Sequence, residues 1–161
     1  MEILQFAIDM ELDGERYYRE QAAKNAQNPL RTVFEILADD EARHAGLLRS
    51  KRDGKPYELA ARAEALTVRS VFSDAAGYEA RVKELPDQPE LYQAAQTVEQ
   101  QSIDLYRDLL SKAVDERTAA LFTFLVGEET EHLRILEEFY QHVNRPNAWV
   151  ESAEFGVREE Y

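Results

Sequence analysis

Apolar residues recur along most of this chain at intervals of three and four positions, the period of an α-helix with one buried face. The six glycines and five prolines are few, and they fall at breaks in the pattern. Four long helices are predicted: about 2–26, about 30–52, from the DQPEL segment (87–91) to about 113, and from after 115 to about 143. No strand pattern is longer than a few residues, so the chain is predicted to be all-α.

The lengths of the connections predict how these helices are arranged. Short connections join the first helix to the second and the third to the fourth, which suits antiparallel helix hairpins. Residues 53–88, with one or two shorter helical pieces, suit a crossover between the hairpins. We therefore expect one bundle domain over residues 1–143, followed by a tail (144–161) without a strong period.

Charged residues stand in the middle of otherwise apolar helix faces. On the second predicted helix, Glu41 and His44 share the 3-4-3-4 spacing of Phe34, Leu37 and Leu48, so all five lie on one face. Similar faces occur on the first and fourth predicted helices. Their members are Leu4, Ile8, Glu11, Tyr18 and Ala22 on the first, and Phe122, Leu125, Glu129, His132 and Leu136 on the fourth.

The two halves of the chain repeat each other at an offset of 88 positions, without a gap. Each half reads Glu, then Tyr seven residues later, then Glu-x-x-His 23 residues after the tyrosine. The matched pairs are Glu11 and Glu99, Tyr18 and Tyr106, Glu41 and Glu129, and His44 and His132. A Glu-x-x-His pair alone is a weak motif, but its duplication with the same partners makes a chance match improbable.

A bundle built from these faces would bury four carboxylates and two imidazoles at one level of its core. Such burial is very costly unless the carboxylates are protonated, paired with cations or exposed to water. No lysine or arginine falls in the stripes. Two divalent cations would balance the four glutamates, and imidazole with carboxylate oxygen suits iron or manganese, with zinc also compatible. The repeat therefore predicts a two-metal site.

Composition narrows the function classes. The net charge of −13 argues against binding of nucleic acid or anionic membranes. The absence of cysteine excludes disulfides, thiolate zinc sites and iron–sulfur clusters. No apolar run approaches the roughly 18 residues of a membrane helix, and the N-terminus shows no secretory signal. A cytoplasmic protein is the default expectation.

The duplicated motif resembles the rubrerythrin-like branch of the ferritin-like superfamily. The resemblance covers about residues 2–52 and 88–143, through MELDGERYY with ADDEARH and TVEQQSIDLY with GEETEH. It implies a ferritin-like four-helix bundle with two iron ions, in which Glu41 and Glu129 bridge or chelate. The implied metal ligands are Glu11, Glu41, His44, Glu99, Glu129 and His132.

The resemblance also implies supporting roles around the ligands. Tyr18 and Tyr106 would each bond a glutamate of the opposite hairpin, a role compatible with that of buried aromatic residues whose hydroxyl needs an acceptor. Asp40 and Glu128 precede the two Glu-x-x-His glutamates. They would accept hydrogen bonds from the histidine of the other half, Asp40 from His132 and Glu128 from His44. The alternative is that both acids lie exposed on a helix flank.

Three departures limit what the resemblance implies. The chain has no four-cysteine iron site of the rubredoxin type, so electrons would have to come from a separate donor such as a rubredoxin. Ser102 stands where rubrerythrin has an additional glutamate, which puts an iron that moves between ligands in doubt. Ala42 stands where bacterioferritin has its heme-binding methionine, so no heme is expected.

The leading hypothesis is a non-heme di-iron oxidoreductase that reduces hydrogen peroxide or dioxygen, acting as a homodimer. The main alternative is a ferroxidase of an iron-storage protein, although the short hairpins and the lack of a clear fifth helix speak mildly against it. A substrate oxygenase would need an apolar pocket beside the metals. A metal-free helical interaction module would leave the duplicated carboxylates unexplained.

Overall fold

The computed structural model describes residues 2–27, 29–62 and 89–156, with side chains described for 2–27, 29–62 and 90–141. These residues form four helices and no strand. The helices are α1 (Glu2–Lys24), α2 (Leu30–Arg52), α5 (Pro89–Ser111) and α6 (Glu116–Gly156). The all-α prediction is confirmed. No helix in the described ranges combines the length and apolarity needed to cross a membrane.

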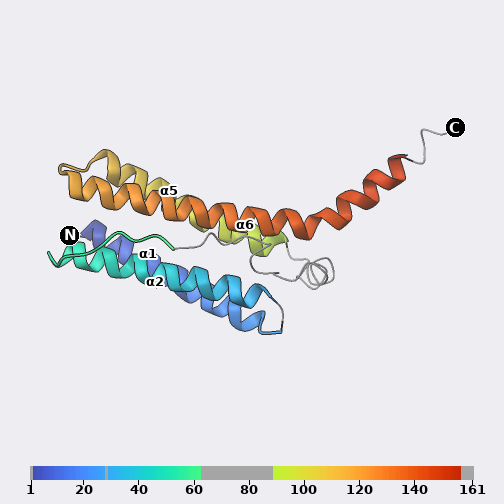
Figure 1. The fold of residues 1–161 in the computed structure, drawn as a ribbon, viewed down its shortest axis with the longest axis horizontal. Coiled ribbons are helices and arrows are strands. Elements are labelled where there is room, and N and C mark those ends of the chain that lie inside the picture. The colour runs from blue at the N-terminus through green and yellow to red at the C-terminus, as the bar shows by residue number, and fades with distance from the viewer. Residues whose placement is uncertain (1, 28, 63–88, 157–161) are drawn as a thin grey trace.

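The helices pair as two hairpins, α1 with α2 and α5 with α6, and together they form a four-helix bundle (Figure 1). This is the predicted ferritin-like arrangement, with the two hairpins joined by a long connection. Residues 55–62 at the start of that connection are irregular. The one or two short helical pieces expected in the connection fall mostly on residues 63–88, which lie outside the described residues.

The ends of the helices follow from local sequence. Basic residues occupy the last turn of α2, where they offset the negative end of the helix dipole. Gly54 then adopts a φ of +66°, and its N–H donates to the carbonyl of Lys51 at 3.3 Å. At the start of α6, the side chain of Asp115 accepts the N–H of Thr118 at 2.8 Å. These local contacts fix the end of the first hairpin and the turn inside the second.

Two apolar clusters fill the bundle on either side of its middle. The first, which we call the Phe34 cluster, has Tyr18 and Phe34 stacked with ring centres 6.1 Å apart. The second, the Phe122 cluster, contains the equivalent pair Tyr106 and Phe122, also stacked at 6.1 Å. On α2, Leu37 belongs to the first cluster and Leu48 to the second. The stretch of α2 between these two leucines therefore lies at the level where the two clusters meet.

Helix α6 is longer than predicted. The sequence pattern ends the fourth helix at about residue 143, whereas α6 continues to Gly156 and so includes most of the expected tail. The tail has no strong apolar period and contains Pro146, but a proline in a helix removes only one backbone hydrogen bond and kinks the axis. Figure 1 shows the red end of α6 at an angle to the rest of the helix and projecting beyond the bundle.

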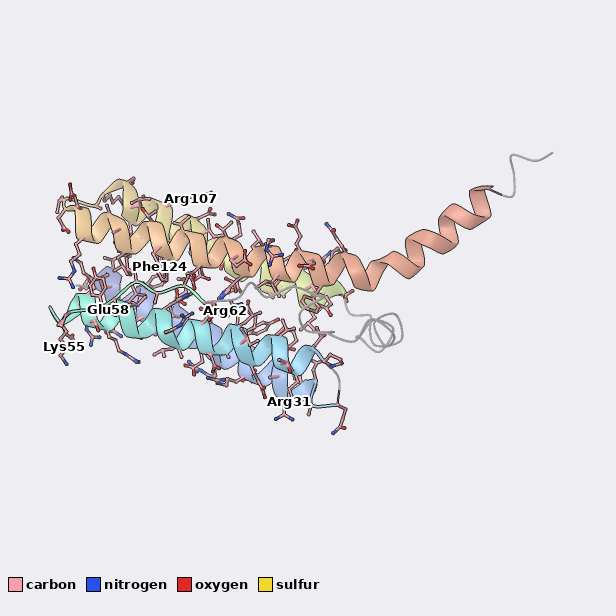
Figure 2. The ribbon with its side chains drawn as sticks, in the orientation of Figure 1. Arg31, Lys55, Glu58, Arg62, Arg107 and Phe124 are labelled. Atoms are coloured by element: carbon pink, nitrogen blue, oxygen red, sulfur yellow. The ribbon has the colours of Figure 1, made fainter. Side chains whose placement is uncertain are left out.

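The irregular residues 55–62, which we call the return segment, run back along the bundle after α2 (Figures 1 and 2). Tyr57 packs against the Phe122 cluster, and the guanidinium of Arg117 lies 4.5 Å from its ring centre. Arg43 on α2 donates a hydrogen bond to the carbonyl of Ala60 at 3.0 Å. These contacts hold the return segment against both hairpins.

Candidate metal centre

The four helices bring six acidic and histidine side chains together between the Phe34 and Phe122 clusters. None of the six is more than 4% exposed. Their ligand atoms form two overlapping groups, each with all atoms within 4.8 Å of one another. The first group is Glu11, Glu41, His44 and Glu129, and the second is Glu41, Glu99, Glu129 and His132. Glu41 and Glu129 belong to both groups, which is the arrangement expected for two neighbouring metal ions.

The two histidines point the same ring atom into this cluster. Nδ1 of His44 lies 2.9 Å from Oε1 of Glu129, and Nδ1 of His132 lies 3.0 Å from Oε1 of Glu41. The two rings are stacked, with centres 5.6 Å apart and planes inclined by 23°. Each histidine thus faces a glutamate of the opposite hairpin, so neither hairpin assembles the cluster alone.

The outer nitrogens of both histidines face carboxylates. Nε2 of His132 lies 3.0 Å from Oδ2 of Asp40, and Nε2 of His44 lies 3.3 Å from Oε2 of Glu128. A carboxylate only accepts, so each Nε2 donates and Nδ1 remains the atom that faces the cluster. Asp40 is 4% exposed, and the side chain of Glu128 is 12% exposed. The alternative of exposed acids on a helix flank therefore does not describe either residue.

Two buried tyrosines fix the unshared glutamates. The hydroxyl of Tyr18 on α1 donates to Oε1 of Glu99 on α5, and the hydroxyl of Tyr106 on α5 donates to Oε1 of Glu11 on α1. Burial, followed by the charges of nearby glutamates, raises the pKa of both tyrosines well above the ordinary value. They therefore remain protonated donors, and each orients a carboxylate supplied by the other hairpin.

Without cations the cluster is electrostatically strained. Burial, and then the charges of Glu11 and Glu129, raise the pKa of Glu41 well above its ordinary value. Burial and the charge of Glu129 raise the pKa of Glu99 to about 8. Burial lowers the pKa of His44, but the charge of Glu129 and the contacts with nearby carboxylates outweigh it, so the net pKa is raised well above normal. Protons thus offset the charge that metal ions would otherwise balance.

Unpartnered atoms show that the cluster fits metal ions. Within the described side chains, several buried atoms of the cluster make no well-directed hydrogen bond, although both histidine Nδ1 atoms lie close to carboxylate oxygens. The atoms without such a bond are Oε2 of Glu11, both carboxylate oxygens of Glu129, and Nδ1 of His44 and of His132. Buried polar atoms are normally paired, and metal coordination is one way to satisfy them. Carboxylate oxygens with imidazole nitrogens form a donor set that suits iron, manganese or zinc.

Sequence reasoning did not identify two arginines beside the cluster. Arg43 lies 2.6 Å from Oδ1 of Asp40, and Arg62 of the return segment lies 2.6 Å from Oδ2. Burial raises the pKa of Asp40, but the hydrogen bonds from His132 and Arg62 outweigh it and lower the pKa to about 2. The three-residue spacing of Asp40 and Arg43 on α2 is a signal that could have been used. Nothing in the sequence pattern points to Arg62.

A close approach of helix α1 to the cluster was also missed. A Cβ atom added at Gly14 would lie 3.2 Å from Oε2 of Glu41, tighter than an ordinary contact. The equivalent residue in the other hairpin is Ser102, whose hydroxyl donates to the carbonyl of Val98 at 3.2 Å. A glycine one turn after Glu11 therefore leaves room for the carboxylate of Glu41.

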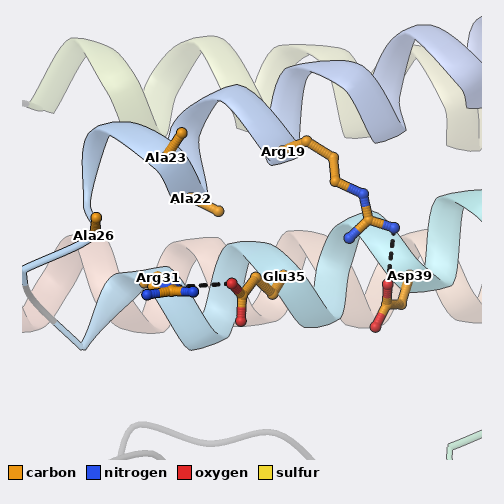
Figure 3. A pocket seen from close by; sticks show the side chains of 7 residues that line it. All are labelled: Arg19, Ala22, Ala23, Ala26, Arg31, Glu35 and Asp39. Atoms are coloured by element: carbon orange, nitrogen blue, oxygen red, sulfur yellow. Dashed lines mark hydrogen bonds and ion pairs between the residues drawn. The ribbon is translucent and has the colours of Figure 1, made fainter.

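A surface hollow of about 520 Å³ lies between α1 and α2 and is separate from the cluster (Figure 3). Alanines from α1 line part of it, together with two arginines. Both arginines are engaged, Arg19 with Asp39 and Arg31 with Glu35, each at 2.9 Å. No residue of the cluster lines this hollow, so it adds nothing to the metal centre.

Comparison with known proteins gives one match. A family model described as rubrerythrin matches residues 2–140, which include both hairpins and all six residues of the cluster. Comparison with curated proteins and with solved structures gives no match.

Proposed function

The chain belongs to the rubrerythrin family, and we propose that it is a di-iron oxidoreductase that reduces hydrogen peroxide or dioxygen. The observation that carries this proposal is the pair of overlapping, buried groups that share Glu41 and Glu129. Both groups have inward-facing atoms without a hydrogen-bond partner. The same residue types fit manganese or zinc, so the assignment to iron rests on the family.

In this proposal each ion has its own histidine and glutamate and shares two further glutamates with the other ion. Glu11 and His44 belong to one half, and Glu99 and His132 to the other, as the two overlapping groups imply. Two bound ferrous ions would supply the two electrons that, with two protons, convert hydrogen peroxide to two molecules of water.

The residues of the chain supply binding, orientation and exclusion of water. The glutamates balance the charge of the ions, and the hydroxyls of Tyr18 and Tyr106 hold two of them in place. Asp40 and Glu128 orient the histidine rings. The Phe34 and Phe122 clusters close the bundle on both sides of the site, which keeps bulk water away from it.

The electron donor is proposed to be a separate protein such as a rubredoxin. The sequence contains no cysteine, and so no thiolate-bound iron that could pass electrons within the chain. A transient complex with the donor would then return the oxidised site to its reduced state after each turnover. We further expect the protein to be a homodimer.

The test is to add ferrous iron to the metal-free protein without oxygen, count bound iron, and then add peroxide or oxygen while recording the absorbance spectrum. We expect two irons per chain and a faster reaction with peroxide. A faster reaction with oxygen, with uptake of far more than two irons and a large closed shell by size-exclusion chromatography, would instead indicate ferroxidase and storage activity.

A matched control is Glu131→Gln. Glu131 lies between Glu129 and His132 in sequence, but its carboxylate pairs with Arg134 on the surface at 2.7 Å. We expect this variant to bind two irons as the parent protein does. Failure of the parent protein to bind two ions of iron, manganese or zinc would refute the assignment of the centre.

A further inference from the structure

We propose that Arg62 is a positioning residue that fixes His132 through Asp40, so that the two histidines of the centre are held unequally. The inference concerns the ligands of the proposed metal centre and rests on that proposal. It assigns a role to the return segment, which lies outside the four helices of the bundle.

Asp40 is fully engaged by cationic and ring N–H donors. Its Oδ1 atom lies 2.6 Å from Arg43, and its Oδ2 atom lies 2.6 Å from Arg62 and 3.0 Å from Nε2 of His132. A buried carboxylate with two guanidinium partners stays ionised and accepts strong, short hydrogen bonds. Asp40 is therefore a fixed acceptor for the ring N–H of His132.

The other histidine has a weaker support. Oε2 of Glu128 lies 3.3 Å from Nε2 of His44, and its nearest guanidinium is that of Arg43 at 3.5 Å. Among the described side chains Glu128 has no second guanidinium within ion-pair distance. Glu128 is also longer by one methylene group and more exposed than Asp40. Asp40 and Glu128 are equivalent in the repeat, but Asp40 therefore holds His132 more firmly than Glu128 holds His44.

Arg62 reaches Asp40 because the return segment lies along the bundle. Figure 2 labels Lys55, Glu58 and Arg62 in order along this segment, and Arg62 is the one nearest the middle of the bundle. The side chain of Arg62 is 26% exposed, and the backbone around it is irregular. Segments with few backbone hydrogen bonds open locally at lower cost than helices. The support of His132 therefore depends on a more easily opened part of the chain than the support of His44.

The test is NMR of the histidine ring nitrogens, which reports each histidine separately in the metal-free and the zinc-bound protein. We expect the Nε2 proton of His132 to exchange with solvent more slowly than that of His44 in the parent protein. In Arg62→Gln, exchange at His132 should accelerate roughly tenfold or more, as a charge-assisted contact is lost. Exchange at His44 should stay within about twofold, because its acceptor is untouched.

Two further variants separate positioning from general loosening. Arg62→Lys keeps the cation and should restore part of the slow exchange at His132. Arg117→Gln removes the contact with Tyr57 at the other end of the return segment and should leave both histidines unchanged. Equal acceleration at both histidines in Arg62→Gln, no acceleration at His132, or the same acceleration in Arg117→Gln would each overturn the proposal.

The result also separates this proposal from the assignment of the metal centre. If zinc leaves the Nδ1 resonances of both histidines unshifted, the metal centre is wrong. The exchange rates in the metal-free protein then still show whether Arg62 holds His132 through Asp40. If zinc shifts both Nδ1 resonances but Arg62→Gln changes neither exchange rate, only the role of Arg62 is wrong.

Discussion

The hairpins α1–α2 and α5–α6 are alike in the side chains that face the cluster and different in what surrounds them. Each contributes two glutamates, one histidine and one tyrosine at the same spacing. The differences lie among the residues that surround these side chains, where Gly14 corresponds to Ser102 and Asp40 to Glu128. Among the described residues, the return segment forms a salt bridge with Asp40, through Arg62, and none with Glu128.

This comparison shows that a duplicated set of donors does not make two equal half-sites. Tyr18 bonds Glu99, Tyr106 bonds Glu11, and each histidine faces the opposite hairpin, so every half depends on the other. The inequality comes from the residues that position the donors. Three experiments break or sharpen this comparison.

The largest effect is expected at the shared glutamates. Glu129→Gln removes a charge common to both groups, whereas Glu11→Gln removes one that belongs to a single group. We expect Glu129→Gln to abolish binding of both ions, with affinity lowered by a factor of about 100 or more, and Glu11→Gln to leave one ion bound. Elemental analysis of metal per chain after dialysis measures this difference.

The control for this pair is again Glu131→Gln, with two metals per chain. Circular dichroism should show that all three variants keep the helical content of the parent protein, since the amide preserves the shape of the side chain. If Glu11→Gln and Glu129→Gln lose the same number of ions, the division into shared and unshared glutamates is wrong.

The second largest effect is expected when the pH is changed, because metal binding depends on the protonation of Glu99. In the metal-free protein the pKa of Glu99 is raised to about 8 by burial and by the charge of Glu129, so this carboxyl carries a proton at neutral pH. A metal ion has to displace that proton, and binding therefore strengthens as the pH rises towards 8 and weakens as it falls. Each proton released changes the apparent affinity by about tenfold per pH unit.

Titration of the metal-free protein with zinc at pH 6, 7 and 8 measures this dependence, together with the protons released into a weakly buffered solution. We expect at least one proton per chain at pH 7. An affinity for zinc that does not change between pH 6 and 8, with no proton release, would contradict the raised pKa of Glu99.

The smallest effect is expected at the pair Gly14 and Ser102. Gly14→Ala places a methyl group 3.2 Å from Oε2 of Glu41. Ser102→Ala removes a hydroxyl that bonds the carbonyl of Val98 on its own helix and makes a weak 3.7 Å contact with the sulfur of Met10, and neither partner belongs to the cluster. Alanine is favoured over glycine within a helix by about 1 kcal/mol. We expect Gly14→Ala to raise the stability of the metal-free protein by up to about that amount while lowering metal affinity by roughly 3- to 10-fold.

Thermal unfolding of the metal-free variants and zinc titration at one pH measure the two quantities separately. Ser102→Ala should change metal affinity by less than about twofold. If Gly14→Ala leaves metal affinity unchanged, the close approach of α1 to Glu41 does not position that carboxylate.

The helices, their pairing and the six candidate ligands could be predicted from the sequence alone, because a helical period and an ungapped internal repeat are both visible in the order of the residues. Glu41 and His44, three residues apart within an apolar face, show their common direction in the primary structure. The match of Glu129 and His132 at an offset of 88 positions then indicates which residues meet across the bundle.

The end of α6 and the surroundings of the cluster could not be predicted in the same way. A helix continues through Pro146 only if its other backbone bonds outweigh the one that is lost, and residue preferences do not measure that balance. Arg62 meets Asp40 across 22 residues of chain, through an irregular segment without any period. The contact of Gly14 with Glu41 likewise depends on how closely two helices approach. Such contacts are set by packing in three dimensions, and for that reason they leave no pattern in the order of the amino acids.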